Sequence, residues 1–382
     1  MKLALVGVGG AGGRLVDAIR GVEAQGGRQL CYGNLLTVDI SRTVGGELDH
    51  VPQDRHVTIG DTHRDVEDGV DGDQDLAVEV TRTDFPEIHR ALDSVTMRKL
   101  DGVLVVTGLG GGTGSGAGAV LVERLQEMYD KPVYVFGVLP AADEGGRAAL
   151  NAARALRSVV PAADSTLLFD NDRWVDADGD ADAAGERYER ANQELASRVV
   201  TLFARGDHDP SSIGANTLDS SDIVRTLSPG GVASVGYAET ELDGGDGLLS
   251  WLRSVLFGSR GNDGSNERTD AEKIQGLVRQ SLDSRLTLPC EVSSAERVLV
   301  VLSGPPDELS RRGFESARQW LEEETETVEV LAGDDPRVGA STVAATVLLS
   351  NVTEVPRIDS LQERAVEHER ADGALRAPDG TD

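Results

Sequence analysis

The chain has 382 residues, which indicates two domains, and its 39% of hydrophobic residues can bury a substantial core. Its 66 acidic residues outnumber the 37 Lys and Arg, and the formal net charge of −29 excludes nucleic acid and anionic membrane surfaces as expected partners, because phosphate groups bind to basic surfaces. Two cysteines cannot form a disulfide framework, and no apolar run approaches the roughly 18 residues of a membrane span, so we expect a soluble cytoplasmic protein without membrane insertion.

The N-terminal half alternates apolar runs with helical patterns. Short apolar runs typical of buried strands lie at 3–6, 35–38, 103–107, 133–139 and 166–169. Helical patterns lie at 14–22, 117–129 and 151–159. Strands that are apolar throughout and separated by helices indicate a parallel sheet covered on both faces. We therefore predict an α/β fold with a doubly wound parallel sheet in residues 1–184.

The second half follows one long helical pattern. Residues 185–205 have the apolar period of a helix, and the polar residues up to 214 form a linker. A second α/β domain is predicted at 215–355, with a helix at 268–284 and strands at 297–302, 327–331 and 341–349. Residues 356–382 are polar and charged, and we expect a flexible tail with no more than a short helix.

A first glycine-rich motif, GVGGAGG at 7–13, directly follows the first predicted strand. Such a turn before a helix lets backbone N–H groups approach phosphate oxygens. Asp39 ends the second predicted strand and is a candidate for binding a ribose hydroxyl. This pair of features also fits an NAD-dependent oxidoreductase, and a glycine turn made only for tight packing is a further alternative.

A second motif, GLGGGTGSG at 108–116, follows the third predicted strand. Two glycine-rich turns in one sheet predict two phosphate-binding loops at the same edge, whereas a dinucleotide fold needs only one. No Lys precedes Thr113 or Ser115, so the segment is not a Walker P-loop. Backbone amides, these two hydroxyl groups and a metal ion would then have to balance the phosphate charge.

The sequence GGGTGSG at 110–116 resembles the phosphate-loop motif of the tubulin and FtsZ superfamily of GTPases. The surrounding motifs are most similar to the archaeal CetZ branch, namely LPAADEGG at 139–146, FDND at 169–172, LDSSDI at 218–223 and GGV at 230–232. The resemblance covers about residues 1–350. It implies a tubulin/FtsZ-like fold: a GTPase domain, a long central helix and a second α/β domain with a mixed sheet.

The resemblance also implies a guanine-nucleotide site. The residues expected there are Gly9, Gly10, Ala11, Gly12, Arg14, Gly69, Gly110, Gly111, Gly112, Thr113, Gly114, Ser115, Glu144, Asn171, Tyr188 and Asn192, together with Asp39. The two glycine loops would hold the phosphates, and the loop at 69–73 would sense the γ-phosphate. Glu144 would bind ribose and Asn171 the guanine edge. Tyr188 would stack on the purine while Asn192, on the same helix face, reads its polar edge.

Asp219 and Asp222 lie three residues apart at the start of a predicted helix. Taken alone, two such acids are explained by helix capping and by the helix dipole. The resemblance implies a catalytic role instead: the acids enter the nucleotide site of the next subunit and orient water at the γ-phosphate. Many relatives have Glu at the second position, where this chain has the shorter side chain of Asp222.

We therefore expect a GTPase that binds GTP and GDP, uses Mg²⁺ held mainly by the phosphates rather than by the protein alone, and takes K⁺ as a further candidate cation. Head-to-tail self-assembly, with accessory cytoskeletal proteins as further candidate partners, would complete the site. The resemblance favours cell-shape control over division. The acidic composition with few lysines favours a salt-rich cytosol, as in a halophilic archaeon. The alternatives are a GTP-binding regulatory or scaffold homologue with weak hydrolysis, a non-enzymatic scaffold and the NAD-dependent oxidoreductase.

Overall fold

The structure, a computed structural model, describes residues 1–26, 28–63, 66, 68–174, 184–204, 219–242, 266–283, 286–309, 311–325, 329–337 and 339–376. The strands are β1 Leu3–Val8, β2 Leu35–Asp39, β3 His56–Thr58, β4 Gly102–Gly108, β5 Val133–Leu139, β6 Ser165–Asp170, β7 Val232–Glu241, β8 Arg297–Gly304, β9 Val330–Pro336 and β10 Thr342–Ser350. The α-helices are α1 Gly9–Gly26, α2 Gln74–Leu92, α3 Gly112–Met128, α4 Gly145–Ala162, α5 Asn171–Trp174, α6 Ala184–Phe203, α7 Ser220–Leu227, α9 Asn266–Asp283, α10 Arg311–Thr325 and α11 Pro356–Arg376. Short 3-10 helices lie at η1 Val44–Glu47, η2 Gln53–Arg55, η3 Met97–Lys99, η4 Ala142–Glu144, η7 Val292–Ser294 and η8 Pro306–Glu308.

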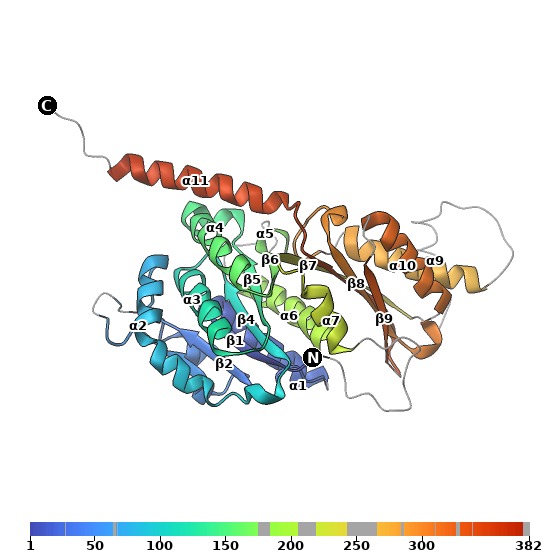
Figure 1. The fold of residues 1–382 in the computed structure, drawn as a ribbon, viewed down its shortest axis with the longest axis horizontal. Coiled ribbons are helices and arrows are strands. Elements are labelled where there is room, and N and C mark those ends of the chain that lie inside the picture. The colour runs from blue at the N-terminus through green and yellow to red at the C-terminus, as the bar shows by residue number, and fades with distance from the viewer. Residues whose placement is uncertain are drawn as a thin grey trace.

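The strands of the described residues form one sheet in the order β3-β2-β1-β4-β5-β6-β7-β10-β8-β9 (Figure 1). Neighbouring strands from β3 to β7 are parallel, as predicted for the N-terminal half. β10 is antiparallel to both β7 and β8, while β9 is parallel to β8. The predicted combination of a doubly wound parallel sheet and a mixed sheet is confirmed, and β7 joins the two parts into one continuous sheet.

The two faces of the parallel sheet are covered by different helices. Successive residues of a strand point to opposite faces, so Leu3 and Leu5 of β1 pack with α1 and α6, while Ala4 and Val6 pack with α2 and α3. The helix that follows β1 thus lies on one face and the helix that follows the neighbouring β4 lies on the other. Ligands of doubly wound folds bind at such a switch point, beyond the carboxyl ends of the strands.

Helix α6 runs between the end of the parallel sheet where its strands terminate (the carboxyl edge) and the end where they begin (the amino edge). Near its start, Tyr188 lies beside Glu144, which follows the carboxyl end of β5. At its end, the carbonyl of Phe203 accepts a 2.8 Å hydrogen bond from the amino group of Met1, just before β1 begins. Its 20 residues span about 30 Å, the length of a helix at 1.5 Å per residue.

The C-terminal part differs from the prediction at two places. The strand expected at 327–331 is β9 at Val330–Pro336, and its register with β8 carries Gly333 to Pro336, which are poor strand formers, into the ladder. The flexible tail expected from residue 356 is helical up to 376, and α11 lies along α4 (Figure 1). Leu361 and Ala365 are buried in this contact. The polar composition concealed the helix because only a narrow apolar stripe packs.

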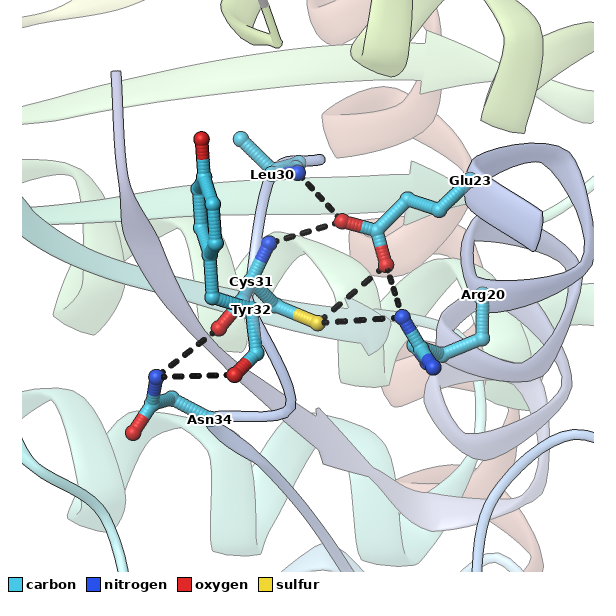
Figure 2. A network of polar contacts seen from close by, with 6 residues as sticks. All are labelled: Arg20, Glu23, Leu30, Cys31, Tyr32 and Asn34. Carbon is cyan, nitrogen blue, oxygen red and sulfur yellow. Dashed lines mark hydrogen bonds and ion pairs between the residues drawn. The ribbon is translucent and has the colours of Figure 1, made fainter. Parts of the chain in front are cut away.

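The turn between α1 and β2 is built around the fully buried carboxylate of Glu23 (Figure 2). One carboxylate oxygen accepts hydrogen bonds from the backbone N–H groups of Leu30 and Cys31, and the other pairs with Arg20 at 2.6 Å. Burial and the charge of Glu23 raise the pKa of the Cys31 thiol to about 12. Both cysteines are free. In the part of the chain that the structure describes, no helix is both long and apolar enough to cross a membrane.

Candidate functional site

The carboxyl ends of four parallel strands, β1, β4, β5 and β6, surround a cavity of about 210 Å³. It is lined by Val8, Gly9, Gly10, Ala11, Val70, Asp71, Gly72, Gly108, Gly110, Gly111, Gly112, Thr113, Gly114, Val138, Pro140, Glu144 and Asn171. Both glycine motifs, the loop before α2 and the turns after β5 and β6 therefore meet in one place. They meet at the switch point of the sheet.

Two helix N-termini open onto this cavity. Helix α1 begins at Gly9 and α3 at Gly112, each within a few residues of the end of its strand. The N–H groups in the first turn of a helix have no intrahelical acceptor and carry partial positive charge. Among the described lining residues there is no Lys or Arg, so backbone amides, the Thr113 hydroxyl and the Asn171 side-chain amide supply the donors. This donor set suits an anionic, phosphate-bearing ligand.

Close packing in the glycine loops requires glycine at two positions. Gly9 adopts a φ of +70°, in the region that side-chain-bearing residues rarely occupy. A Cβ atom added at Gly114 would lie 2.1 Å from the carbonyl oxygen of Gly108. At Gly111, in contrast, an added Cβ would meet nothing within 4 Å, because this residue faces the open cavity. Gly9 and Gly114 therefore permit close packing, whereas Gly111 leaves the cavity open.

The rim of the cavity carries the polar side chains of Glu144, Asn171 and Tyr188. The Nδ2 of Asn171 lies 3.4 Å from Oε1 of Glu144, and that oxygen also accepts a 2.7 Å hydrogen bond from the N–H of Ala141. Burial raises the pKa of the Tyr188 hydroxyl, with further increases from the charges of Glu144 and Asp143 and a hydrogen bond to Glu144. Three residues predicted from separate motifs are thus close neighbours.

Several predicted residues do not line the cavity. Ser115 is buried, and its hydroxyl donates to the carbonyl of Gly111 rather than facing a ligand. Gly12 is buried, and an added Cβ there would lie 2.2 Å from the carbonyl oxygen of Val106, so it permits close packing of α1 on the sheet. Arg14 is half exposed and pairs with Glu47 at 3.0 Å. These three residues shape the surroundings of the cavity.

Asp39, Gly69 and Asn192 also lie outside the cavity lining. Asp39 is 3% exposed, and its Oδ1 accepts from the N–H groups of Ile40 and Ser41, so it holds the turn after β2. Burial raises the pKa of its carboxyl. Gly69 precedes the lining residues of its loop and has a φ of +88°. Asn192 is half-buried on α6, one turn beyond Tyr188.

Asn151 of α4 is a further residue of the site that sequence reasoning missed. Its Nδ2 donates to the carbonyl oxygens of Gly72, at 3.0 Å, and Gly110, at 3.1 Å. It is 4% exposed and therefore joins the loop before α2 to the second glycine loop from beneath. An Asn inside an amphipathic helical pattern gave no signal of this role, because both partners are backbone groups distant in the sequence.

Asp219 and Asp222 lie at the opposite, amino edge of the sheet. Oδ1 of Asp219 accepts from the N–H of Ser221 at 2.7 Å, and Oδ2 of Asp222 accepts from the N–H of Asp219 at 2.8 Å. The two acids thus form a reciprocal capping box at the start of α7. Shortly after α7, the carbonyl of Gly231 accepts from Thr166 at the beginning of β6, which places this helix at the amino edge.

A cluster of charged residues fastens the end of α7 to the C-terminal part. Arg225 and Arg297 both pair with Glu329 at 2.8 Å. Arg297 also donates to the Ser228 hydroxyl at 2.6 Å. Because Arg297 opens β8 and Glu329 precedes β9, the cluster holds α7 at the amino ends of these strands. The end of α7 is therefore held at the amino edge of the sheet, whereas the cavity lies at the carboxyl edge.

Comparison with known proteins agrees with these features. The model of the Tubulin/FtsZ family GTPase domain matches residues 2–178, and that of the tubulin-like CetZ C-terminal domain matches residues 181–367. Tubulin-like protein CetZ1 of Haloferax volcanii is 41% identical over 372 residues, which cover 96% of this chain and 92% of the relative. The chain belongs to the tubulin-like CetZ family. The resemblance inferred from the glycine motifs is thereby confirmed.

Further CetZ proteins and solved structures extend this relationship. CetZ3 of Haloferax volcanii is 44% identical over 372 residues, which cover 97% of this chain and 93% of the relative. A GDP-bound CetZ1 monomer from that organism superposes with a TM-score of 0.82 at 38% identity, and a GTPγS-bound CetZ2 protofilament with 0.83 at 34%. Both superpositions cover 97% of this chain and 100% of the relative. An FtsZ structure from M. jannaschii, at 19% identity and a TM-score of 0.66, shares the fold.

Proposed function

We propose that this chain is a cytoskeletal GTPase of the cytoplasm that binds GTP and assembles head to tail into protofilaments. The observation that carries the proposal is the separation of the glycine-lined cavity from Asp219 and Asp222, at opposite edges of one sheet. When identical molecules stack with the amino edge of one sheet against the carboxyl edge of the next, the acids of one molecule approach the cavity of the other. Such a contact does not close on itself and therefore generates a filament. The CetZ2 relative, solved as a GTPγS-bound protofilament, supports this arrangement.

In this proposal the backbone amides of Gly10, Ala11, Thr113 and Gly114 bind the phosphates. The charge of a triphosphate also requires a cation, and Mg²⁺ fits the site because the carboxylate of Asp71 lines the cavity. No cluster of three or more His, Cys, Asp or Glu side chains able to hold a metal occurs among the described residues. The phosphates themselves would therefore be the main ligands, and K⁺ is a further candidate counterion.

Recognition of guanosine would depend on the rim of the cavity. The carboxylate of Glu144 would accept from the ribose hydroxyls, and the amide of Asn171 would hydrogen-bond the guanine edge. Tyr188 would stack on the purine, while Asn192, one turn further along α6, would read its polar edge. The contact between Glu144 and Asn171 supports a common ligand for these two residues, because both belong to the same wall of the cavity.

Hydrolysis would be completed in trans by Asp219 and Asp222, which would orient a water molecule at the γ-phosphate of the neighbouring subunit. Phosphoryl transfer depends mainly on positioning and charge neutralisation, so an incomplete half-site can stay inactive until two subunits meet. The capping box that engages both acids favours one alternative, a regulatory or scaffold homologue with weak hydrolysis. Within the cell, we propose a role in shape control, with accessory proteins as further partners.

Turnover of GTP across a titration of protein, with light scattering recorded in parallel, tests this proposal. The measurement belongs in concentrated KCl, because a net charge of −29 is strongly self-repelling at low salt. We expect activity to rise more steeply than linearly with protein concentration and scattering to appear over the same range. Activity strictly proportional to concentration would contradict assembly-dependent hydrolysis. GTP binding with little turnover at any concentration would support the scaffold alternative.

A further inference from the structure

Helix α11 reaches the wall of the cavity through the largely buried side chain of Arg357. Its Nε donates to Oδ1 of Asp170 at 2.9 Å, and its Nη2 donates to the carbonyl oxygen of Pro140 at 2.6 Å. The side chain of Arg357 is only 11% exposed and that of Asp170 only 3%. A guanidinium presents its donors in a rigid plane, so two contacts fix both distance and angle.

The two partners of Arg357 belong to different turns of the cavity wall. Pro140 follows β5 and lines the cavity itself, while Asp170 ends β6 and directly precedes Asn171, which also lines it. The same two turns are joined by the N–H of Ala142, which donates to Oδ1 of Asp172 at 2.7 Å. Arg357 therefore holds from the outside the pair of turns that present Glu144 and Asn171 on the inside.

The carboxylate of Asp170 needs such a partner. Burial raises the pKa of this carboxyl, and the hydrogen bond and charge of Arg357 oppose that increase. Oδ1 of Asp170 also accepts from the N–H of Asp172 at 3.2 Å, in the first turn of α5. Removing the guanidinium would leave a buried carboxylate beside the residue expected to contact the base, and the turn would move to reach solvent or another donor.

We infer that Arg357 is a positioning residue of the nucleotide site, which sets the spacing between the Glu144 and Asn171 turns and makes α11 part of guanosine recognition. This inference rests on the proposed function. Selectivity would then depend on a helix that, in the part of the chain the structure describes, carries no residue lining the cavity. If Arg357 gave only general structural support, its removal would weaken the binding of all nucleotides alike. If it spaces the sugar-contacting and base-contacting turns, its removal would instead change the discrimination between nucleotides that differ in sugar or base.

The test compares Arg357→Met, which keeps length and apolar bulk, with Arg357→Lys, which keeps the charge but not the planar set of donors of the guanidinium. The matched control is Arg370→Met, which removes an exposed guanidinium from the same helix. Equilibrium binding of GDP, IDP and 2′-deoxy-GDP is measured for each full-length variant in concentrated KCl. IDP lacks the exocyclic amine of the guanine edge, and 2′-deoxy-GDP lacks one ribose hydroxyl. Thermal unfolding without nucleotide reports on the fold.

We expect Arg357→Met to bind GDP roughly tenfold more weakly, as the loss of a charge-assisted contact would give, with both the GDP:IDP and GDP:2′-deoxy-GDP preferences reduced. Arg357→Lys should fall between it and the wild type, and Arg370→Met should match the wild type. An equal loss of affinity for all three nucleotides, or unchanged affinity, would overturn the inference. If Arg357→Met does not fold, unchanged preferences in Arg357→Lys would overturn it. A wild type that binds no GDP would overturn the proposed function as well, which separates the two failures.

Discussion

The carboxyl and amino edges of the parallel sheet present opposite kinds of polar group. At the carboxyl edge, two helix N-termini offer backbone N–H groups around a cavity of about 210 Å³. At the amino edge, α7 presents the carboxylates of Asp219 and Asp222. Helix α6, 20 residues long, runs from one edge to the other. A ligand bound among the amides therefore cannot meet these carboxylates within one molecule, and a site that uses both requires a second copy.

A large effect is expected from blocking the carboxyl edge with Gly112→Val. An added Cβ at Gly112 would lie 2.7 Å from a methyl group of Val70 and 2.8 Å from the carbonyl carbon of Gly72, so the loop before α2 must move. Overpacking of about 1–3 kcal/mol corresponds to a loss of about 5- to 150-fold in GDP affinity when it falls on the binding loop. Fluorescence titration with a labelled GDP checks this.

The matched control for Gly112→Val is Gly111→Ala, because an added Cβ at Gly111 meets nothing within 4 Å and its backbone is extended. Its melting temperature without nucleotide should equal that of the wild type. Wild-type GDP affinity in Gly112→Val would show that the loop at 70–73 does not form part of the binding site.

The next effect separates capping from catalysis at the amino edge. Asp219→Asn keeps an oxygen that caps α7, whereas Asp219→Ala loses the cap at about 1 kcal/mol. We expect both variants to bind GDP normally and to lose GTP turnover by about 100-fold, as for loss of a group that positions a proton acceptor. Only Asp219→Ala should also melt earlier. Steady-state turnover and thermal unfolding, measured together, distinguish the two roles.

If Asp219→Asn retains full turnover, the acid serves only as a cap. Asp222→Ala provides an independent check, because its Oδ2 accepts from the N–H of Asp219. This variant should bind GDP, turn over slowly and form longer-lived filaments. Filaments that disassemble at the wild-type rate would remove Asp222 from the proposed mechanism.

The smallest effect concerns the turn before β2, where burial and the charge of Glu23 raise the pKa of the Cys31 thiol from 9.0 to about 12. A thiol whose folded pKa is raised contributes stability below its unfolded pKa and loses that contribution as the pH rises toward the folded value. Stability should therefore decline between about pH 9 and 12. Iodoacetamide at about pH 8 should label Cys31 far more slowly in folded than in unfolded Cys290→Ala protein. Equal labelling rates would show that the turn opens.

Much of the N-terminal sheet was predictable because its strands are buried on both faces and therefore appear as continuous apolar runs. Leu3–Val8 and Val133–Leu139 are buried throughout. In contrast, β7 alternates buried with more exposed positions toward its end and contains Gly236, so its pattern was weak. Helix α2 was missed because Pro86 and many polar residues interrupt its apolar period. Pairing and packing with distant segments fix these elements.

The candidate site was predictable where its donors are backbone groups of glycine loops, because glycine itself is the signal. Gly110 and Gly112 fall on the cavity for this reason. Ser115 and Arg14 lie outside the cavity lining, since their side chains have local partners that no motif reveals. Arg357 lies 217 residues from Pro140 in the chain, and only the docking of α11 brings them together.

The most direct test of a site shared between two copies is complementation between two inactive variants. Gly112→Val would bind nucleotide weakly but keep its aspartates, and Asp222→Ala would lack an aspartate but keep its cavity. GTP turnover is measured for each alone and for an equimolar mixture at the same total concentration in concentrated KCl. We predict that the mixture exceeds the mean of the separate rates, because an intact cavity then meets an intact acid pair at some contacts. A mixture that only equals this mean, although both variants assemble together, would contradict hydrolysis in trans.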